Sequence, residues 1–344
     1  MSVKMSKCGG VQKMRNFDND IMVSINCITY NHEKYIKDAI EGFLMQKTKF
    51  KYEILIHDDA STDRTPDIIK KYEQEYPDII KPIYEIENQY SQDKRVNFEF
   101  NYKRSKGKYI ALCEGDDYWT DPYKLQKQID FLEQHTNFSM CFHNVEVIDE
   151  NGTELQEHWP ANTKVGKITT LKDILKGNYI PTASTVFRNK SINIRDFYTL
   201  SEGLFFEDWI YHIMNAKNGP IYCFKEKMGV YRVTNAGLIR STDEIRMLGD
   251  VLTLYERLEN YFDDSRIISL LSKRILETRL DIFIQQSLRG NLEEANEVLE
   301  NIKAKDVFMK AGLKRSLKYI LLRLSPDKYK DVVRAYKKLR GIKE

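Results

Sequence analysis

A buried strand, a helix and a second buried strand near the start of the chain limit its possible folds more than any other feature. Residues 21–29 read IMVSINCIT, an almost unbroken apolar and β-branched run that is typical of a strand covered on both faces. Residues 36–44 then place their apolar side chains on one helical face, and the apolar run EILIH follows at residues 53–57. This order predicts a right-handed βαβ unit with parallel strands, and ligands bind such sheets at the carboxyl ends of the strands.

The alternation of strands and helices continues along the chain. Helices are predicted to begin at Thr65-Pro66-Asp67, which combines a cap, a proline and an acid in the first turn, and at Asp121-Pro122. Strands are predicted at residues 79–86 and 108–113. The first half of the chain therefore reads as an α/β fold.

After Phe138 the predicted strands become shorter, and a hairpin turn is indicated at Asn151-Gly152. Two more strands are predicted at residues 182–188 and 228–233, on either side of a helix at residues 207–217. Beyond residue 241 only amphipathic helices are indicated. We therefore expect three parts: a flexible segment at residues 1–19, an α/β domain at residues 20–240 and a helical region at residues 241–344.

The composition excludes several classes of protein. With 42% hydrophobic and 31% charged residues among its 344, the chain is not disordered. No run approaches the roughly 18 apolar residues of a membrane span, and the N-terminus lacks the apolar core of a signal peptide, so we expect a soluble cytoplasmic protein. Five cysteines without CxxC spacing predict neither disulfides nor a zinc site, and a net charge of +3 gives no indication of nucleic-acid binding.

Basic residues are concentrated at the C-terminal end. Residues 311–344 contain eleven Lys or Arg and three Asp or Glu, a net charge of +8, so the residues before them carry −5. Apolar residues recur at helical spacing in residues 313–324 and again in residues 329–339. Basic amphipathic helices bind anionic membrane surfaces, but such apolar faces also pack on the rest of a protein, and both interpretations stay open.

Two acidic groups directly follow predicted strands. The first, DDASTD at residues 58–63, is able to accept hydrogen bonds from a nucleoside base or a ribose, with a capped polar loop as the alternative. The second, Glu114-Gly115-Asp116-Asp117, places three carboxylates within four residues, and these repel one another unless a cation or hydrogen bonds hold them. Oxygen ligands of this kind suit Mg²⁺ or Mn²⁺, and a solvated acidic turn fits less well between an apolar strand and Tyr118-Trp119.

Two further motifs are candidates for chemistry. Glu207-Asp208-Trp209 lies in an aromatic stretch that would raise the pKa of an acid and so suit a general base, while an acidic pair at a helix N-terminus is the alternative. Arg232 and Arg240 are candidates for contacting a diphosphate, or are exposed cations. The chain has no GxxxxGK[ST] and no GxGxxG motif, which argues against phosphate-loop ATPases and dinucleotide-binding folds.

The order of the runs VSINCITYNHEKYIKDAIEGFLMQ, DDASTDRT, GKYIALCEGDDYWTDPYKLQKQIDFL and FEDW resembles the family-2 glycosyltransferases with the GT-A fold, of the type that builds bacterial surface polysaccharides. The resemblance covers residues 20–240. It implies a mostly parallel central sheet flanked by helices. It also implies transfer of a sugar, with inversion, from a nucleoside-diphosphate donor, usually uridine-linked, to a hydroxyl of a glycan or lipid-linked acceptor.

The resemblance further implies roles for individual residues. Tyr30 and Asp59 are expected to contact the nucleoside base, and Asp58 to support their loop. Asp208 falls where the family places its catalytic base. As the base it would take a proton from the acceptor hydroxyl.

The metal and diphosphate contacts include two departures from the family. Glu114 and Asp116 occupy the acid positions of the DxD-like motif, where the first is one methylene longer than the usual Asp. Asp117 is expected to contact Mn²⁺ or Mg²⁺, with Asp116 on the ribose or the metal. Family members often have a histidine two residues after Arg232, where this chain has a threonine, so Arg232 or Arg240 is expected to contact the diphosphate instead.

Two other classes of protein fit part of the pattern. A nucleotidyltransferase that makes activated sugars also combines an α/β fold with acidic metal ligands, but it usually carries a glycine-rich, basic signature where this chain reads ITYNHEKYI. A catalytically inactive module that binds nucleotide sugars or glycans would be favoured if the acids bound no metal. All three acidic clusters are present, which favours the transferase.

Overall fold

The structure, a computed structural model, describes residues 21–92, 95–160, 164–235, 242–300 and 302. The strands are β1 (Ile21–Thr29), β2 (Lys51–Asp58), β3 (Ile80–Tyr84), β4 (Tyr109–Leu112), β5 (Tyr118–Trp119), β6 (Met140–Asp149), β7 (Glu154–Trp159), β8 (Ile168–Thr169), β9 (Val186–Arg188) and β10 (Ile221–Val233). The helices are α1 (Ile36–Leu44), α2 (Thr65–Glu75), α3 (Lys124–Gln134), α4 (Leu171–Ile174), α5 (Ile194–Ser201), α6 (Asp208–Asn218), α8 (Glu244–Tyr261), α9 (Ser265–Arg289) and α10 (Leu292–Glu300). The N-terminal segment, Arg240 and the basic tail of the sequence prediction lie outside the described residues.

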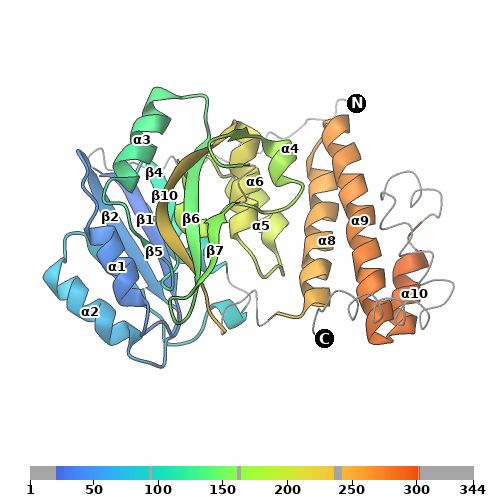
Figure 1. Cartoon of the computed structure of the whole chain (residues 1–344), viewed down its shortest axis with the longest axis horizontal. Coiled ribbons are helices and arrows are strands. Elements are labelled where there is room, and N and C mark those ends of the chain that lie inside the picture. The colour runs from blue at the N-terminus through green and yellow to red at the C-terminus, as the bar shows by residue number, and fades with distance from the viewer. Residues whose placement is uncertain (1–20, 93–94, 161–163, 236–241, 301, 303–344) are drawn as a thin grey trace, which may run out of the picture.

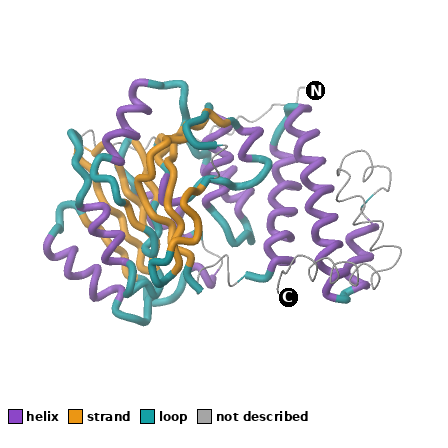
Figure 2. Tube along the Cα trace, in the orientation of Figure 1, coloured by secondary structure: helices purple, strands orange, loops and turns teal. Residues whose placement is uncertain are grey.

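One mixed sheet with strand order β3-β2-β1-β4-β9-β6-β10-β5 forms the centre of the molecule, between helices on both sides (Figure 2). The pairs β1–β2, β2–β3 and β1–β4 are parallel, which confirms the βαβ unit of the sequence analysis. Strand β9 runs antiparallel to both β4 and β6, and β6 pairs in parallel with β10. The predicted α/β fold with a central sheet flanked by helices is therefore confirmed.

Each face of the sheet buries its own hydrophobic core. Helices α1, α2 and α3 cover one face and α4, α5 and α6 the other (Figure 1). In β4, Tyr109 and Ala111 belong to the first core, whereas Ile110 and Leu112 belong to the second. This alternation, with period two, explains why the strand reads as a continuous apolar run in the sequence.

The turn at Asn151-Gly152 is confirmed, because β6 and β7 pair as an antiparallel hairpin and Gly152 has a φ of 84°. Three local predictions are wrong. Helix α3 begins at Lys124, with Tyr123 as its cap residue, and not at Asp121-Pro122. Thr65 is the first residue of α2 rather than its cap, and its N–H donates to Asp63 Oδ1 (2.9 Å). The strand expected at residues 182–188 begins only at Val186, because residues 182–184 form a 3₁₀ turn.

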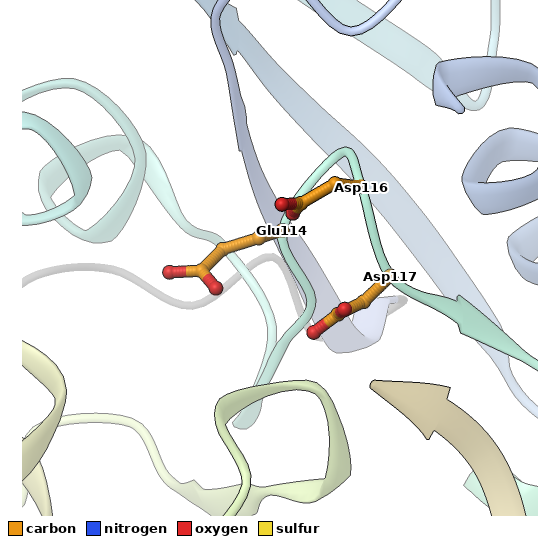
Figure 3. Close-up of side chains that lie close together, drawn as sticks. All are labelled: Glu114, Asp116 and Asp117. Atoms are coloured by element: carbon orange, nitrogen blue, oxygen red, sulfur yellow. The ribbon is translucent and has the colours of Figure 1, made fainter. Parts of the chain in front are cut away.

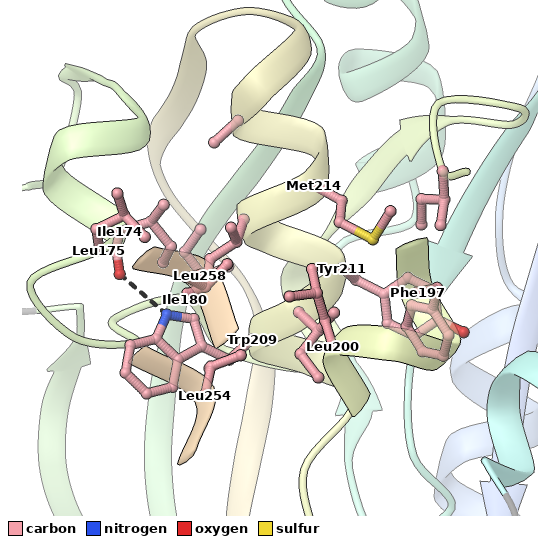
Figure 4. Packing of buried hydrophobic residues seen from close by; sticks show 14 of the residues in the cluster. Ile174, Leu175, Ile180, Phe197, Leu200, Trp209, Tyr211, Met214, Leu254 and Leu258 are labelled. Carbon is pink, nitrogen blue, oxygen red and sulfur yellow. Dashed lines mark hydrogen bonds between the residues drawn. The ribbon is translucent and has the colours of Figure 1, made fainter. Parts of the chain in front are cut away.

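Helix α8 and the first half of α9 continue the second core, whereas the second half of α9 packs with α10 in a small separate cluster. Trp209 of α6 donates its indole N–H to the carbonyl of Ile174 (2.9 Å), and Leu254 and Leu258 of α8 pack in the same cluster (Figure 4). Asp243 caps α8 by accepting the N–H of Ile245 (2.9 Å). Within the described part of the chain, none of the helices combines the length and the apolar character that crossing a bilayer requires. The division of the chain at residue 241 stays a prediction.

Candidate active site

Five of the predicted donor-binding residues lie where the parallel strands end: Tyr30, Asp58, Asp59, Glu114 and Asp116. Strands β2, β1 and β4 are neighbours and parallel, so the segments that follow them emerge together. The N–H of Asp59 donates to the carbonyl of Thr29 (3.0 Å), and the N–H of Gly115 donates to that of Ile28 (2.9 Å). These backbone bonds join two segments to the end of β1: residues 58–63, which we call the DDASTD loop, and residues 114–117, which we call the acidic turn. Tyr30, next along the chain, is 46% exposed.

Asp59 is a buried carboxylate held by backbone N–H groups. It accepts the N–H of Gln89 (2.7 Å) and of Tyr90 (3.0 Å), and its Oδ1 lies 3.4 Å from His57 Nε2. Burial alone would raise the pKa of Asp59, but these hydrogen bonds outweigh burial and lower it. Asp59 is therefore ionised at neutral pH and fixes residues 89 and 90 beside the loop. Its expected contact with a nucleoside base stays a prediction.

Asp58 is buried beneath the same loop. Burial raises its pKa, although hydrogen bonds from Ser61 act in the opposite direction. Its Oδ1 has no hydrogen-bond partner among the residues that the structure describes. This location fits the expected supporting role, which stays a prediction.

The acidic turn brings three carboxylates together. Glu114, Asp116 and Asp117 each offer an oxygen, and these oxygens lie within 4.8 Å of one another. Figure 3 shows the three side chains projecting from a single turn toward the same side. Burial, followed by the charges of Asp116, Asp208 and Glu207, raises the pKa of Glu114 to about 8.

Asp117 is the most buried of the three, at 1% exposed. Its Oδ1 accepts the N–H of Arg232 (2.8 Å), whereas its buried Oδ2 has no partner in the described part of the chain. Burial, followed by the charges of Asp116 and Glu114, raises its pKa well above the usual range. A cation between the three carboxylates would remove both the repulsion and the missing contact of Oδ2.

Gly115 allows the acidic turn to pack against the loop after β1. A Cβ at this position would lie 2.6 Å from Thr29 Oγ1 and 3.0 Å from His32 Nδ1, so only glycine fits without a shift. The same imidazole places its Nε2 3.9 Å from Asp116 Oδ2. No other histidine lies at metal-ligand spacing from His32 in the sequence, so spacing alone does not indicate this contact.

Arg232 joins the acidic turn to α1. Its guanidinium donates to the carbonyl of Asp116 (2.8 Å), pairs with Asp38 (3.2 Å) and stacks over the ring of Tyr35 at 4.5 Å. These contacts hold the turn in place. The expected contact of Arg232 with a diphosphate stays a prediction, and Arg240 is outside the described residues.

Asp208, the predicted base, is the first residue of α6. Asn178 Nδ2 (2.8 Å) and Thr182 Oγ1 (3.4 Å) both donate to its Oδ2, and Asn178 Oδ1 lies 3.2 Å from His212 Nδ1. Burial raises the pKa of Asp208, and the N–H of Trp209 with these side-chain bonds only partly offsets that rise. The direction agrees with the apolar neighbourhood noted in the sequence.

Glu207 connects the base to the segment before β4. Its partly buried carboxylate accepts the N–H of Phe98 (3.2 Å), and desolvation raises its pKa to about 7. The charges of Glu207 and Asp208 both raise the pKa of Glu114, so the base region and the acidic turn are near enough to interact electrostatically. Asn178 and Thr182 were missed in the sequence because they are 30 and 26 residues from Asp208, with no motif linking them.

Solved structures with a similar fold identify the fold class of the chain. The fold resembles the crystal structure of S. aureus TarS 1-349 in complex with UDP-GlcNAc, with a TM-score of 0.67, 16% identity and 92% of each chain covered. It also resembles the mannosyltransferase PcManGT from Pyrobaculum calidifontis in complex with GDP-Man and Mn²⁺, with a TM-score of 0.52, 12% identity, and 96% of this chain and 87% of that one covered. The fold is thus the GT-A fold of nucleotide-sugar glycosyltransferases.

The family follows from the sequence match. Residues 24–196, half of the chain, match the family described as glycosyl transferase family 2, and the chain belongs to this family. An uncharacterised protein of Mycobacterium tuberculosis is 39% identical over 210 residues, which is 61% of this chain. The matched region spans 58% of that relative's own length.

Proposed function

We propose that this glycosyltransferase transfers a hexosyl or N-acetylhexosaminyl group, with inversion, from a nucleoside-diphosphate donor to a hydroxyl of a glycan or lipid-linked acceptor. The observation that carries the proposal is the acidic turn at Glu114–Asp117, whose three carboxylate oxygens lie within 4.8 Å of one another. Glu114 in this turn is near enough to Asp208 for the charge of Asp208 to raise its pKa. The donor is most simply a UDP-sugar. Support for a nucleotide-sugar donor comes from the GT-A structures crystallised with UDP-GlcNAc and with GDP-Man.

The donor half of the site is built from the ends of β1, β2 and β4. Tyr30 offers an exposed ring and Asp59 an ionised carboxylate to the nucleoside. Glu114, Asp116 and Asp117 would hold Mn²⁺ or Mg²⁺, because their oxygens converge and Asp117 Oδ2 has no other described partner. A bound divalent cation would offset the charge that develops on the departing diphosphate.

The acceptor half of the site is built around Asp208. Its Oδ2 is held by Asn178 and Thr182, which fixes the carboxylate and stabilises its ionised form. In that form it removes a proton from the acceptor hydroxyl as the oxygen attacks the anomeric carbon opposite the diphosphate. A positioned base contributes roughly 100- to 10,000-fold to the rate, and a single displacement without a covalent intermediate inverts the anomeric centre.

The donor is tested by thermal shift. The chain is mixed with a panel of UDP, GDP, dTDP and CMP sugars, with and without Mn²⁺. A ligand at one hundred times its Kd stabilises the native state by about 2.7 kcal/mol, which is well within reach of this method. If sugars of a single nucleotide give a Mn²⁺-dependent shift, the proposal is supported and the nucleobase of the donor is identified. If no member of the panel gives a shift, the proposal is overturned.

A turnover assay distinguishes the transferase from the alternative, a non-catalytic binding module. The module binds a nucleotide sugar but releases no nucleoside diphosphate when candidate acceptors are added, whereas a transferase does. Location at the inner face of the cell membrane, and a role in polysaccharide synthesis, are part of the proposal and depend on a lipid-linked acceptor.

A further inference from the structure

Tyr231 lies in β10 where this strand reaches the acidic turn. The N–H of the next residue, Arg232, donates to Asp117 Oδ1 (2.8 Å), so the peptide between Tyr231 and Arg232 contacts the turn. Burial raises the pKa of the Tyr231 phenol, and four carboxylates add to the rise: Asp117, Glu114, Asp116 and Asp208. The charges of the acidic turn and of the predicted base thus reach the phenol, which stays protonated and is a hydrogen-bond donor at neutral pH.

The ring of Tyr231 is fixed while its hydroxyl is available. The indole of Trp159, at the end of β7, packs edge-on against the ring with centroids 4.8 Å apart and an angle of 73°. Both side chains are only partly buried. Among the residues that the structure describes, none is hydrogen-bonded to the Tyr231 hydroxyl. A fixed aromatic ring with a free donor is suited to a polar ligand with an apolar face.

A single displacement restricts what occupies this position. The anomeric carbon must lie between the diphosphate, at the acidic turn, and the acceptor hydroxyl, at Asp208. Successive side chains of a strand point to opposite faces, and the guanidinium of Arg232 contacts Asp38 of α1. Tyr231 therefore leaves β10 on the other face, directly beside the backbone contact with Asp117, which fits a place next to the sugar that moves. Sugar rings present hydroxyls at their rim and C–H groups on their faces, which matches a phenol hydroxyl and an aromatic ring.

We propose that Tyr231, held by Trp159, contacts the transferred sugar of the donor by donating a hydrogen bond to it. The inference rests on the proposed function, because it assumes a nucleotide-sugar donor at this site. The residue that contacts the sugar thus belongs to β10, whereas the nucleoside is expected to contact Tyr30 and the DDASTD loop. Tyr231 therefore contributes to the affinity for the sugar and not to that for the nucleotide.

The test compares a nucleotide sugar with its bare nucleotide. Calorimetry with Mn²⁺ measures the Kd of UDP-N-acetylglucosamine and of UDP for the full chain and for Tyr231→Phe, or of GDP-mannose and GDP if the panel selects guanosine. Loss of one hydrogen bond weakens binding by about threefold to tenfold. We expect that loss for the nucleotide sugar and an unchanged Kd for the nucleotide. The unchanged nucleotide Kd also shows that the variant is folded.

Tyr222→Phe is the matched control. Tyr222 belongs to the same strand but stacks on Phe131, with centroids 4.5 Å apart, and should leave both Kd values unchanged. Equal Kd values for the nucleotide sugar in Tyr231→Phe and the parent chain would overturn the inference alone. So would an equal loss for sugar and bare nucleotide. Failure of the parent chain to bind any nucleotide sugar would overturn the proposed function and this inference with it.

Discussion

The carboxylate of Asp208 is fixed by hydrogen bonds from two side chains of another segment. Both side-chain hydrogen bonds to its carboxylate reach Oδ2, from Asn178 and Thr182. We expect Asp208→Asn to abolish transfer while leaving the Kd of the donor largely unchanged, because a base acts on the acceptor and not on the nucleotide. Turnover with the isolated chain and donor calorimetry check both parts. Unchanged turnover would move the role elsewhere, and Glu207 is the next candidate.

Asn178 is expected to lower the pKa of Asp208. Its hydrogen bond to Asp208 lowers a pKa that burial raises, so Asn178→Ala should raise the pKa further. The base acts in its ionised form, so the rate falls as the pH drops through its pKa. The acidic limb of the kcat profile should therefore move to higher pH, and kcat at neutral pH should fall by about tenfold. Asn260→Ala, on the exposed side of α8, serves as the control. If Asn178→Ala had the same kcat–pH profile as Asn260→Ala and the parent chain, Asn178 would not affect the pKa of the base.

Lys124 is a residue whose effect on stability should change with pH. It is fully buried, its Nζ lies 3.8 Å from the ring centre of Trp119, and the amine has no hydrogen-bond partner in the described part of the chain. Burial lowers its pKa from 10.5 to about 7, although the thiol groups of Cys113 and Cys141 act in the opposite direction. Between these two pH values the unfolded chain binds more protons than the native state, so stability rises with pH across the window.

The variant Lys124→Met should remove that dependence. At and below pH 7 the shift corresponds to about 5 kcal/mol against folding, part of which the lost contact with Trp119 would cancel. We expect a gain of about 1–3 kcal/mol at pH 7 and a flatter profile from pH 7 to pH 10. Urea unfolding at several pH values measures both. A destabilised variant with the slope of the parent would show that the amine is satisfied in the native state.

At the residue scale, the sequence predicted contiguous groups better than assembled ones. The acidic turn and Asp208 are recognisable because each motif is continuous and stands beside an apolar run. Asn178 carries no such signal, since it reaches the site only through the packing of a distant element. Arg232 carried a signal, but its observed contacts with Asp38 and the carbonyl of Asp116 could not be read from spacing.

At the level of elements, local periodicity predicted most strands and helices. The order in which the strands pair in the sheet could not be predicted in the same way. Strand β1 begins and ends where its apolar run does, and α1 spans the predicted face. Strand β9 is three residues long and lies between β4 and β6, which precede it in the chain. No period or turn signal encodes such a non-local antiparallel insertion, because its stability comes from neighbours far away in sequence.

The contact between the acidic turn and the end of β1 gives a prediction for this pair of elements. In Gly115→Ala the added Cβ would lie 2.6 Å from Thr29 Oγ1, so the turn must shift. We expect Mn²⁺ affinity in the presence of UDP to fall by about tenfold or more, with a loss of about 1–3 kcal/mol in stability. Calorimetry and urea unfolding measure these two quantities.

Gly249→Ala is the matched control. Gly249 lies inside α8, and a methyl group added to its Cα would meet nothing within 4 Å, so alanine should stabilise the helix by about 1 kcal/mol. It should leave Mn²⁺ binding as in the parent chain. Parental Mn²⁺ affinity in Gly115→Ala would show that the close approach of the turn is not needed for the metal.

At the scale of the whole molecule, the C-terminal helices complete the core behind the predicted base. Leu254, Tyr255 and Leu258 of α8 are fully buried, and Tyr255 packs edge-on against Trp209 with centroids 5.6 Å apart. Burying a large apolar side chain contributes about 1.5–3 kcal/mol, so these three together approach the 5–15 kcal/mol by which domains are stable. A chain ended at residue 240 should therefore lose cooperative urea unfolding. Retention of the parental transition would make residues 20–240 an independent domain, as the sequence suggested.

A chain that ends at residue 310 keeps every described helix and lacks the basic tail of residues 311–344. Comparing it with the full chain therefore shows the effect of the tail alone. The tail carries a net charge of +8, and basic residues near anionic lipid contribute about 1 kcal/mol each. If the tail binds the membrane, the full chain should co-sediment with vesicles that contain anionic lipid, and added salt should release it. The chain ended at residue 310 should stay in solution under both conditions, and neutral vesicles should retain neither form. Equal and salt-insensitive partitioning of the two chains would instead assign the apolar faces of the tail to packing within the protein.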